Sequence, residues 1–239
     1  MVDFCKTEKW GLYYHFIFVA MNIGILEVLV PLITILFKNY KKIPMKADHL
    51  DELENVDIFY LVVNRFTTVS FVYFLSRFCC STQIKWDIKE ATITNTLLPL
   101  PAAYLTYDFF YFIFHWTLHR KQIYGYIHKH HHRQRSPTRG YIDASNVHPL
   151  EFVIGEYLHI LSLSLMPALH GYSILIFFVL SAFMNSLNHT RFDVHWFFNL
   201  YDVKNHDIHH RLPNNNYCIY SRCWDVIFGT FREYNWDKE

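Results

Sequence analysis

Three short groups of histidines in this chain have a regular spacing. The first group has the pattern HxxxH, and the second and third both have the pattern HxxHH. Residues three and four apart share one face of an α-helix, so each group is expected to aim two or three imidazoles at one point. With His189, which follows Asn185 by the same four-residue step, the members are His115, His119, His128, His131, His132, His189, His206, His209 and His210.

Nine imidazoles in this pattern predict a di-metal centre. Imidazole is the commonest metal-binding side chain near neutral pH, and it suits iron, zinc, copper and nickel. One zinc site takes about four protein ligands, so nine candidates are too many for one ion and about right for two. A lone HxxxH pair would be explained more simply as surface or packing residues, but three such groups in succession would not.

Other metal chemistries fit the sequence less well. A zinc protease of the HExxH class is excluded because the motif does not occur. A soluble carboxylate-bridged di-iron bundle needs two Glu-x-x-His motifs. The one present, from Glu156 to His159, lies inside an apolar run and is interpreted as a chance match. A divalent-metal transporter would place its ligands in mid-membrane, whereas these histidines lie mainly on polar segments.

The elements that must hold the histidines are predicted to be membrane helices. The 239 residues are 52% hydrophobic and 19% aromatic, yet the mean hydropathy is only +0.06, which argues against a transporter made mostly of membrane spans. Apolar runs at 12–37, 58–75, 92–114 and 152–189 are long enough for helices that cross a bilayer, and a break at 167–171 makes the last a helical hairpin. The predicted fold is all-α and integral to a membrane, with about four transmembrane helices and a His-rich helical cap that holds the di-metal centre.

Charge predicts which side of the membrane the cap faces. The segment 119–149 is basic and short of apolar residues, so the positive-inside tendency places it in the cytosol, together with the polar tail that follows Arg191. On this topology 76–91 is lumenal, and the endoplasmic reticulum is the expected membrane. No linker divides the chain. We expect membrane helices and loops over 1–91 and a catalytic region over 92–239.

Two charged residues inside apolar runs leave an alternative open. Glu27 and Arg65 are expensive to ionise within a bilayer. They either pair with each other across two helices, or one run is tilted or partial and its charge reaches the interface.

Net charge and cysteines exclude some function classes. The formal net charge is +1, so nothing indicates a nucleic-acid partner. The five cysteines form no CxxC motif or paired framework, and the adjacent Cys79 and Cys80 are interpreted as spare thiols at a membrane edge. A reducing compartment is the simplest interpretation.

From Asp108 to Phe231, about half of the chain, the sequence resembles the fatty acid hydroxylase / sterol desaturase superfamily of membrane-bound, non-haem di-iron enzymes. The resemblance is carried by DFFYFIFHWTLH, YGYIHKHHH, NVHPLE, NHTRFDVHW, HDIHH and WDVIFGTF. The first hundred residues match only as generic membrane helices. The resemblance implies that the nine spaced histidines are the metal ligands.

The same resemblance gives expectations for residues beside the ligands. Asn185 stands where some members have a further histidine, so its amide could hold a water near the metal, and a tenth ligand is left open. Asp108 is expected to orient a ligand imidazole, since metal-bound histidines usually need such a partner. His148 is expected to support the site from behind the ligands rather than bind metal. His130 is expected to be a solvent-side neighbour and His195 to lie outside the site.

The resemblance also implies an activity, O2-dependent hydroxylation or desaturation of a lipid taken from the bilayer. Iron is the expected metal, with zinc possible in recombinant protein, and dioxygen is the co-substrate. Electrons would come from cytochrome b5 or its reductase, docking on the basic segment 119–139, although a juxtamembrane charge bias explains that segment equally well.

HPLE, HDIHH and WDVIFGT favour a sterol substrate, in the manner of a C5-desaturase, a C4-methyl oxidase or a side-chain hydroxylase. Fatty acyl, sphingolipid and alkylglycerol hydroxylation are alternatives. From other classes, a catalytically silent metal-binding membrane protein and a divalent-metal transporter remain open.

Overall fold

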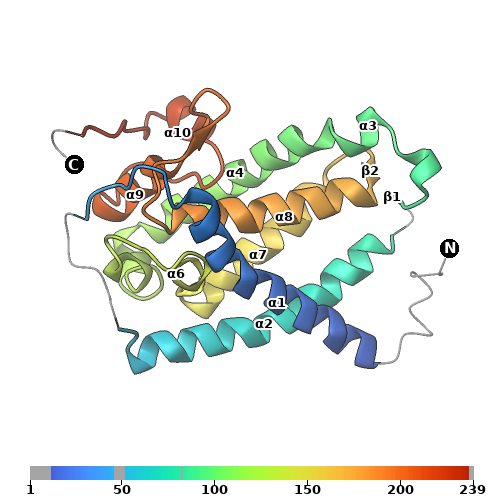
Figure 1. The fold of residues 1–239 in the computed structure, drawn as a ribbon, viewed down its shortest axis with the longest axis horizontal. Coiled ribbons are helices and arrows are strands. Elements are labelled where there is room, and N and C mark those ends of the chain that lie inside the picture. The colour runs from blue at the N-terminus through green and yellow to red at the C-terminus, as the bar shows by residue number, and fades with distance from the viewer. Residues whose placement is uncertain (1–11, 46–51, 82, 237–239) are drawn as a thin grey trace.

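A computed structural model describes residues 12–45, 52–81 and 83–236, and helices form nearly all of its regular structure (Figure 1). The described helices are α1 (Leu12–Phe37), α2 (Asn55–Cys79), η2 (Ile88–Glu90), α3 (Ile93–Thr96), α4 (Pro99–Leu118), α5 (Lys121–Tyr124), η3 (His131–Arg133), α6 (Tyr141–Ser145), α7 (Pro149–Ser164), α8 (Gly171–Asn188), α9 (Val203–Arg211) and α10 (Cys223–Ile227). Two short strand pairs complete them: β1 (Ile84–Lys85) runs parallel to β2 (Leu169–His170), and β3 (His195–Trp196) runs antiparallel to β4 (Tyr201–Asp202).

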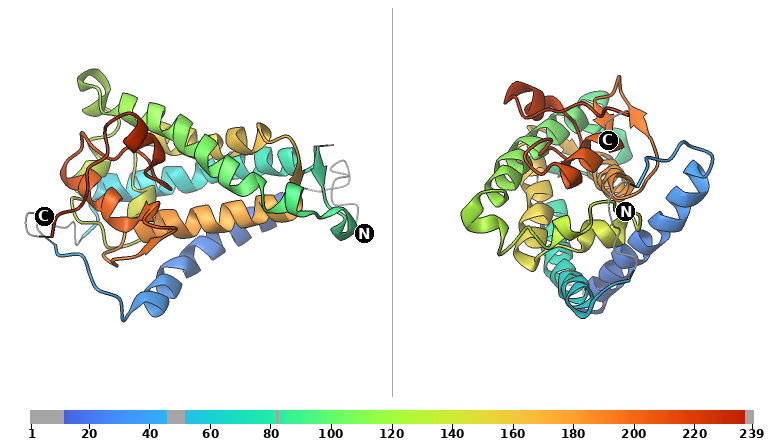
Figure 2. Two further views of the ribbon diagram at one scale, coloured as in Figure 1. Left: turned by 90° about the horizontal axis from the view of Figure 1, so that it is seen from above. Right: turned by 90° about the vertical axis from the view of Figure 1, so that its left-hand side faces the viewer.

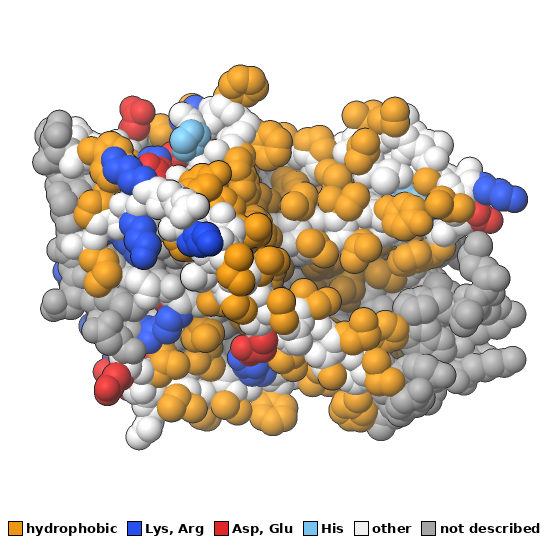
Figure 3. All heavy atoms as spheres, viewed as in Figure 1, with side chains coloured by type: hydrophobic (Ala, Val, Ile, Leu, Met, Phe, Trp, Pro, Cys, Tyr) orange, Lys and Arg blue, Asp and Glu red, His pale blue; other side chains and the backbone are white. Residues whose placement is uncertain are grey.

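Four helical segments are long and apolar enough to cross a membrane: His15–Phe37, Asn55–Cys79, Ile93–Leu118 and Gly171–Asn188. Hydrophobic side chains cover the middle of the molecule, and the charged ones gather at the end that carries α9 (Figure 3). An apolar belt of this kind must face lipid rather than water. The predicted fold class is confirmed, and the chain is a multi-pass membrane protein.

Prolines and polar side chains fix where the key helices begin. Pro99 and Pro149 stand in the first turns of α4 and α7, where the missing N–H costs nothing. At the start of α2 the carboxylate of Asp57 accepts a hydrogen bond of 2.7 Å from the backbone N–H of Glu54. Asp202 caps α9 by accepting from the N–H of Lys204 at 2.9 Å. The helices that carry the histidines therefore begin at defined residues.

The predicted hairpin exists, but its two arms do not pack closely on each other. Helix α7 packs against α2 and α4, whereas α8 packs against α1 and α6. Side chains of both arms, such as His159 and Asn185, line the same cavities. With 16 residues, α7 is about 24 Å long, shorter than the roughly 30 Å hydrocarbon core. The two arms of the hairpin therefore stand apart, and the cavities lie between them.

The segments that carry the nine spaced histidines come together at one end of the bundle. Residues 38–45, 119–148 and 189–236 gather there, and the β1–β2 pair lies at the other end (Figure 1). Seen end-on, α1 and α2 run along one side and α4 with the C-terminal segment along the opposite side (Figure 2). Buried Arg191 fastens this end together, because its guanidinium donates to the carbonyls of Ile43 and Pro44 and to the carboxylate of Asp207. We call this end the cap.

Glu27 of α1 and Arg65 of α2 form an ion pair, so the pairing alternative is confirmed. Their side chains remain 47% and 40% exposed, so the pair sits on the outer surface of the bundle.

Cys79, Cys80, Cys218 and Cys223 form no disulfide, and Cys5 lies outside the described residues.

Candidate metal centre

The nine spaced histidines converge in the cap as two clusters, within each of which the ligand-capable atoms all lie within 4.8 Å of one another. The first cluster consists of His115, His119, His128, His132 and His209. The second cluster consists of His131, His189, His206 and His210. All nine are buried except His119, which is partly exposed.

The two HxxHH groups are split between the clusters, which corrects the expectation that each group aims at one point. In each group the first and last histidines share a cluster, while the middle one, His131 or His209, joins the other cluster. On α9 the backbone turns by about 100° per residue, so the neighbours His209 and His210 diverge whereas His206 and His210, four residues apart, stay within about 40°. Each group therefore links the two sites.

The first HxxHH is not on an α-helix. Residues 125–130 form turns and His131–Arg133 form the 3-10 helix η3, whereas the second HxxHH lies on α9 as predicted. His189 follows the last residue of α8. The cap is thus helical only in part.

Hydrogen bonds behind the imidazoles show which ring nitrogens face the first cluster. The Nδ1 of His115 lies 2.7 Å from the carbonyl of Tyr217, and the Nδ1 of His209 lies 2.7 Å from the carbonyl of Asn215. A carbonyl can only accept, so each Nδ1 carries the proton and each Nε2 turns a lone pair into the cluster. On His128 the carboxylate of Glu151 plays the same part, 2.8 Å from Nδ1.

Lone pairs facing each other require a cation between them. The Nε2 of His128 lies 3.0 Å from the Nε2 atoms of both His115 and His132. The Nε2 atoms of His119 and His209 are buried without a hydrogen-bond partner among the described residues. Two nitrogens bound to one ion at about 2.1 Å lie roughly 3.0–3.4 Å apart in octahedral or tetrahedral sites. The donor set therefore fits a metal ion.

The second cluster has the same construction. The Nδ1 of His189 donates to the carbonyl of Asn185 at 2.9 Å, which leaves its Nε2 unprotonated. That atom lies 3.1 Å from the Nε2 of His206, which lies 3.1 Å from the Nε2 of His210. This cluster also fits one ion.

Burial keeps the imidazoles neutral and therefore able to bind metal. Desolvation lowers the pKa of His132 to about 3, with His115 adding to the effect by electrostatic repulsion. The pKa values of His131, His209 and His210 are lowered well below 6.5, first by burial and then by the neighbouring imidazoles. At neutral pH no proton competes with a metal for these nitrogens.

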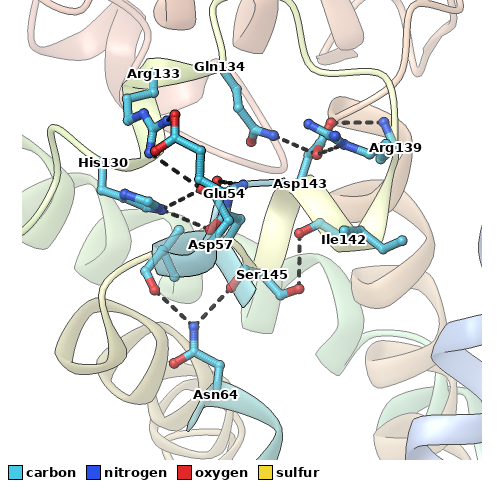
Figure 4. Close-up of polar contacts among 12 residues, drawn as sticks. Glu54, Asp57, Asn64, His130, Arg133, Gln134, Arg139, Ile142, Asp143 and Ser145 are labelled. Atoms are coloured by element: carbon cyan, nitrogen blue, oxygen red, sulfur yellow. Dashed lines mark hydrogen bonds and ion pairs between the residues drawn. The ribbon is translucent and has the colours of Figure 1, made fainter. Parts of the chain in front are cut away.

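Two buried aspartates hold the loop that carries the first HxxHH (Figure 4). Asp143 accepts from the Gln134 amide at 2.6 Å, from the Arg139 side chain at 2.7 Å and from backbone N–H groups of Thr138 and Arg139. Asp57 of α2 lies 3.0 Å from His130. Sequence reasoning missed both aspartates, and also Glu151, because nothing in their local sequence marks them as buried.

The structure places the supporting residues as follows. The Asp108 carboxylate accepts from the backbone N–H groups of Ile219 and Tyr220, at 3.3 and 3.0 Å, so it supports the loop behind the site instead of contacting an imidazole. His148 caps α7 by accepting from the N–H of Leu150, outside both clusters. The Asn185 side chain lines a cavity beside the second cluster, where a water-holding role stays a prediction.

The two histidines expected outside the site are indeed outside both clusters. His195 is exposed on β3. His130 differs from the expectation in one respect, because its ring is mostly buried against α2, with Nε2 2.9 Å from the Asn146 side chain.

The Glu156-x-x-His159 motif belongs to neither cluster, as its interpretation as a chance match to a di-iron motif predicts, but it lies beside the metal centre. Both residues line the cavity that also contacts His131, His189 and His206. The apolar context of the motif concealed this, because the helix is apolar on the face toward lipid and polar on the face toward the cavity.

Comparison with known proteins agrees with this geometry. The profile of the fatty acid hydroxylase family matches residues 100–230, more than half of the chain and the whole range of the two clusters. The chain belongs to the fatty acid hydroxylase family. No solved structure matches significantly.

The relatives of this fatty acid hydroxylase family member include enzymes that act on sterols. It is 21% identical to a C-4 methylsterol oxidase of Schizosaccharomyces pombe, over 83% of this chain and 69% of the relative. It is 31% identical to methylsterol monooxygenase 1 of Rattus norvegicus, over 54% of this chain and 44% of the relative. A cholesterol 25-hydroxylase-like protein of Danio rerio is 28% identical, over 58% and 57% of the two chains. The chain thus spans from about two fifths to two thirds of these relatives.

Replacing one ligand in each cluster should lower the metal content selectively. We expect His131→Ala and His209→Ala to lose at least one of two bound ions per chain and to lose activity, because each removes a donor from a preformed cluster. His195→Ala, at an exposed position on β3 outside both clusters, is the matched control, with both ions retained. Metal analysis of the purified full chain measures this, and an unchanged metal content in both ligand variants would contradict the assignment.

Asp143→Ala should destabilise the protein and release metal. The change leaves buried N–H groups and the Arg139 guanidinium without their acceptor, at a cost of about 3–5 kcal/mol. As a surface control, Glu90→Ala removes the exposed ion pair with Lys85 and should cost at most about 1 kcal/mol. Thermal unfolding in detergent compares the two variants, and equal melting temperatures would refute the role of Asp143.

The metal-free protein should lose stability as the pH falls below about 6.5, the ordinary pKa of histidine. Below this pH the histidines of the unfolded state bind protons, whereas the buried imidazoles of the folded state stay neutral. Each such histidine contributes up to about 1.4 kcal/mol per pH unit between 6.5 and its folded pKa, which is about 3 for His132. Melting temperatures from pH 7.5 to 5 measure the decline. Exposed His195→Ala should leave the slope unchanged, and a flat profile for the unaltered chain would be incompatible with neutral clusters.

Proposed function

We propose that this protein is an O2-dependent lipid oxidoreductase that hydroxylates or desaturates a sterol. The observation that carries the proposal is the pair of imidazole clusters, whose lone pairs converge at the end of an apolar helical bundle. An unactivated C–H bond yields to no side chain alone, so this chemistry requires a metal and dioxygen. The catalytic region would be 92–239, with 1–91 supplying membrane helices.

Iron is the proposed metal in both clusters. Imidazole suits iron as well as zinc, but zinc has no redox chemistry and would serve only as a substitute in recombinant protein. When bound, the di-iron centre would supply the oxidant that attacks the C–H bond. The chain's own residues hold the ligands, as the Tyr217 and Asn215 carbonyls and Glu151 do, and exclude water.

A wall of aromatic residues supports the water-excluding role. The Tyr107 ring lies 4.1 Å from that of His159, and the Tyr220 hydroxyl lies 2.9 Å from the His159 Nε2. Tyr107, Tyr111 and Tyr220 line the cavity next to the second cluster. A substrate carbon in this cavity would meet imidazoles on one side and aromatic rings on the other.

Sterols are the favoured substrate class because several of the relatives are named as sterol oxidases or hydroxylases. Fatty acyl, sphingolipid and alkylglycerol hydroxylation are the alternatives within this proposal.

Electrons would reach the cap from cytochrome b5 or its reductase on the cytosolic face of the endoplasmic reticulum. Of the basic segment 119–139, Arg133 and Arg139 are committed to internal ion pairs with Asp57 and Asp143. The exposed cations are Arg120, Lys121, Lys129 and Arg135, and the docking surface would be built on them.

Expression of the full chain should produce an oxygen-dependent change in cellular sterols. The measurement is mass-spectrometric lipid profiling of cells that express the protein, the His209→Ala variant or neither, under air and under nitrogen. A new hydroxylated or desaturated sterol that needs both oxygen and His209 supports the proposal. An oxidised product among fatty acyl or ether lipids would show that the substrate is one of those lipids and not a sterol. No lipid product with full metal content would indicate a silent metal-binding protein, and vectorial metal uptake into vesicles would indicate a transporter.

A further inference from the structure

Three cavities adjoin one another from the metal centre to the lipid-facing surface. The inner cavity, of about 90 Å³, contacts the second cluster. It shares Glu156, His159 and Asn185 with a middle cavity of about 130 Å³. The middle cavity shares Leu26 and Phe178 with an outer groove of about 370 Å³. A path therefore runs between α1 and α8 from the apolar belt to the imidazoles.

The chemistry of the wall changes along this path. The outer groove is lined almost entirely by apolar side chains of α1 and α8, including Ile25, Leu29 and Leu175, with Trp86 at its far end. The polar side chains gather at the inner end, where α7 and α8 contribute Glu156 and Asn185. A ligand that fits this path has an apolar body and one polar end, and the polar end faces the metals.

Glu156 offers the unused hydrogen-bonding position at that junction. Its Oε2 is shielded from solvent and has no hydrogen-bond partner among the described residues. The neighbouring His159 is committed, because its Nδ1 lies 3.1 Å from the Gly155 carbonyl and its Nε2 accepts from the Tyr220 hydroxyl. Buried polar atoms of folded proteins nearly always have a partner, so a donor on the ligand is the natural partner for Glu156.

The small inner cavity limits how far the oxidised carbon lies from this contact. An engineered apolar cavity of about 150 Å³ just holds benzene, and the inner cavity is smaller. Glu156 and the imidazoles of His131, His189 and His206 line it together. Only a short part of the ligand reaches the metals, so the carbon that reacts is within a few bonds of the group that Glu156 binds.

Building on the proposed function, we infer that Glu156 binds the hydroxyl of a lipid alcohol such as a 3-hydroxysterol and fixes oxidation next to that hydroxyl. The ring system and side chain then lie in the middle cavity and outer groove. This orientation selects a carbon beside the hydroxyl, as in oxidation of a C4 methyl group, and rejects the distant end of an aliphatic side chain. Glu156 is a specificity-determining residue, and it takes no part in metal binding.

The test is equilibrium binding of a matched ligand pair to the purified full chain in nanodiscs. The ligands are radiolabelled lanosterol and its 3-O-methyl ether, which has the same body but no donor. The unaltered protein should bind lanosterol at least tenfold more tightly than the ether. Glu156→Leu should bind the two alike, and Glu156→Gln, which keeps a carbonyl acceptor in the same place, should retain a preference for lanosterol.

Ala182→Phe is the steric control, because Ala182 lines both the middle cavity and the outer groove. It should weaken both ligands without changing their ratio. Metal content and melting temperature establish that each variant is folded.

Equal binding of the two ligands by the unaltered chain, or no saturable binding of either, overturns the inference. Retention of the full preference by Glu156→Leu, or by Glu156→Ala if the leucine variant fails to fold, also overturns it. Because binding needs no turnover, a chain that shows the predicted preference but yields no oxidised lipid refutes only the proposed function. A chain that oxidises sterols but binds both ligands alike refutes only the inference.

Discussion

The structure depends on imidazole nitrogens that face one another at about 3 Å, as those of His115 and His128 do with acceptors behind both rings that leave the facing atoms unprotonated. Such an arrangement is repulsive without a cation, and it is stable in the folded chain only because the outer nitrogens are held in place. Backbone carbonyls of Tyr217, Asn215 and Asn185 fix the tautomers of three rings, and buried aspartates fix the loop between α5 and α6. The organisation of the cap follows from this requirement, because every segment in it supplies a ligand, a carbonyl or an ion pair that orients one.

The membrane helices supply the burial and the apolar surface that the polar cap lacks. Imidazoles on a polar surface would be hydrated and would titrate near neutral pH. Burial against α4, α8 and the C-terminal segment removes this hydration and lowers their pKa, so the imidazoles stay neutral. The same helices place an apolar groove next to the centre. Neutral imidazoles and an apolar groove thus lie side by side, because the charged cap and the apolar belt belong to one bundle.

Much of this was predictable from the sequence. The runs at 12–37 and 58–75 became helices of nearly the same extent, and all nine spaced histidines reached the centre, because both signals are local and repeated. Predictions failed where long-range contacts decide. Asp108 lies two helical turns before His115 and was expected to orient a ligand imidazole. Its carboxylate instead accepts hydrogen bonds from the backbone N–H groups of residues 219 and 220. The position of Glu156 and His159 beside the centre was not predicted, because the sequence does not show that α7 and α8 open around a space. The first HxxHH forms turns and a 3-10 helix instead of the predicted α-helix, and these direct its histidines to two sites.

The division of adjacent His131 and His132 between the clusters has a mechanical consequence. A single peptide unit joins a residue of one cluster to a residue of the other. A movement of the His131 backbone therefore also moves His132. Binding of an ion at one cluster would therefore also fix the backbone that carries a histidine of the other cluster.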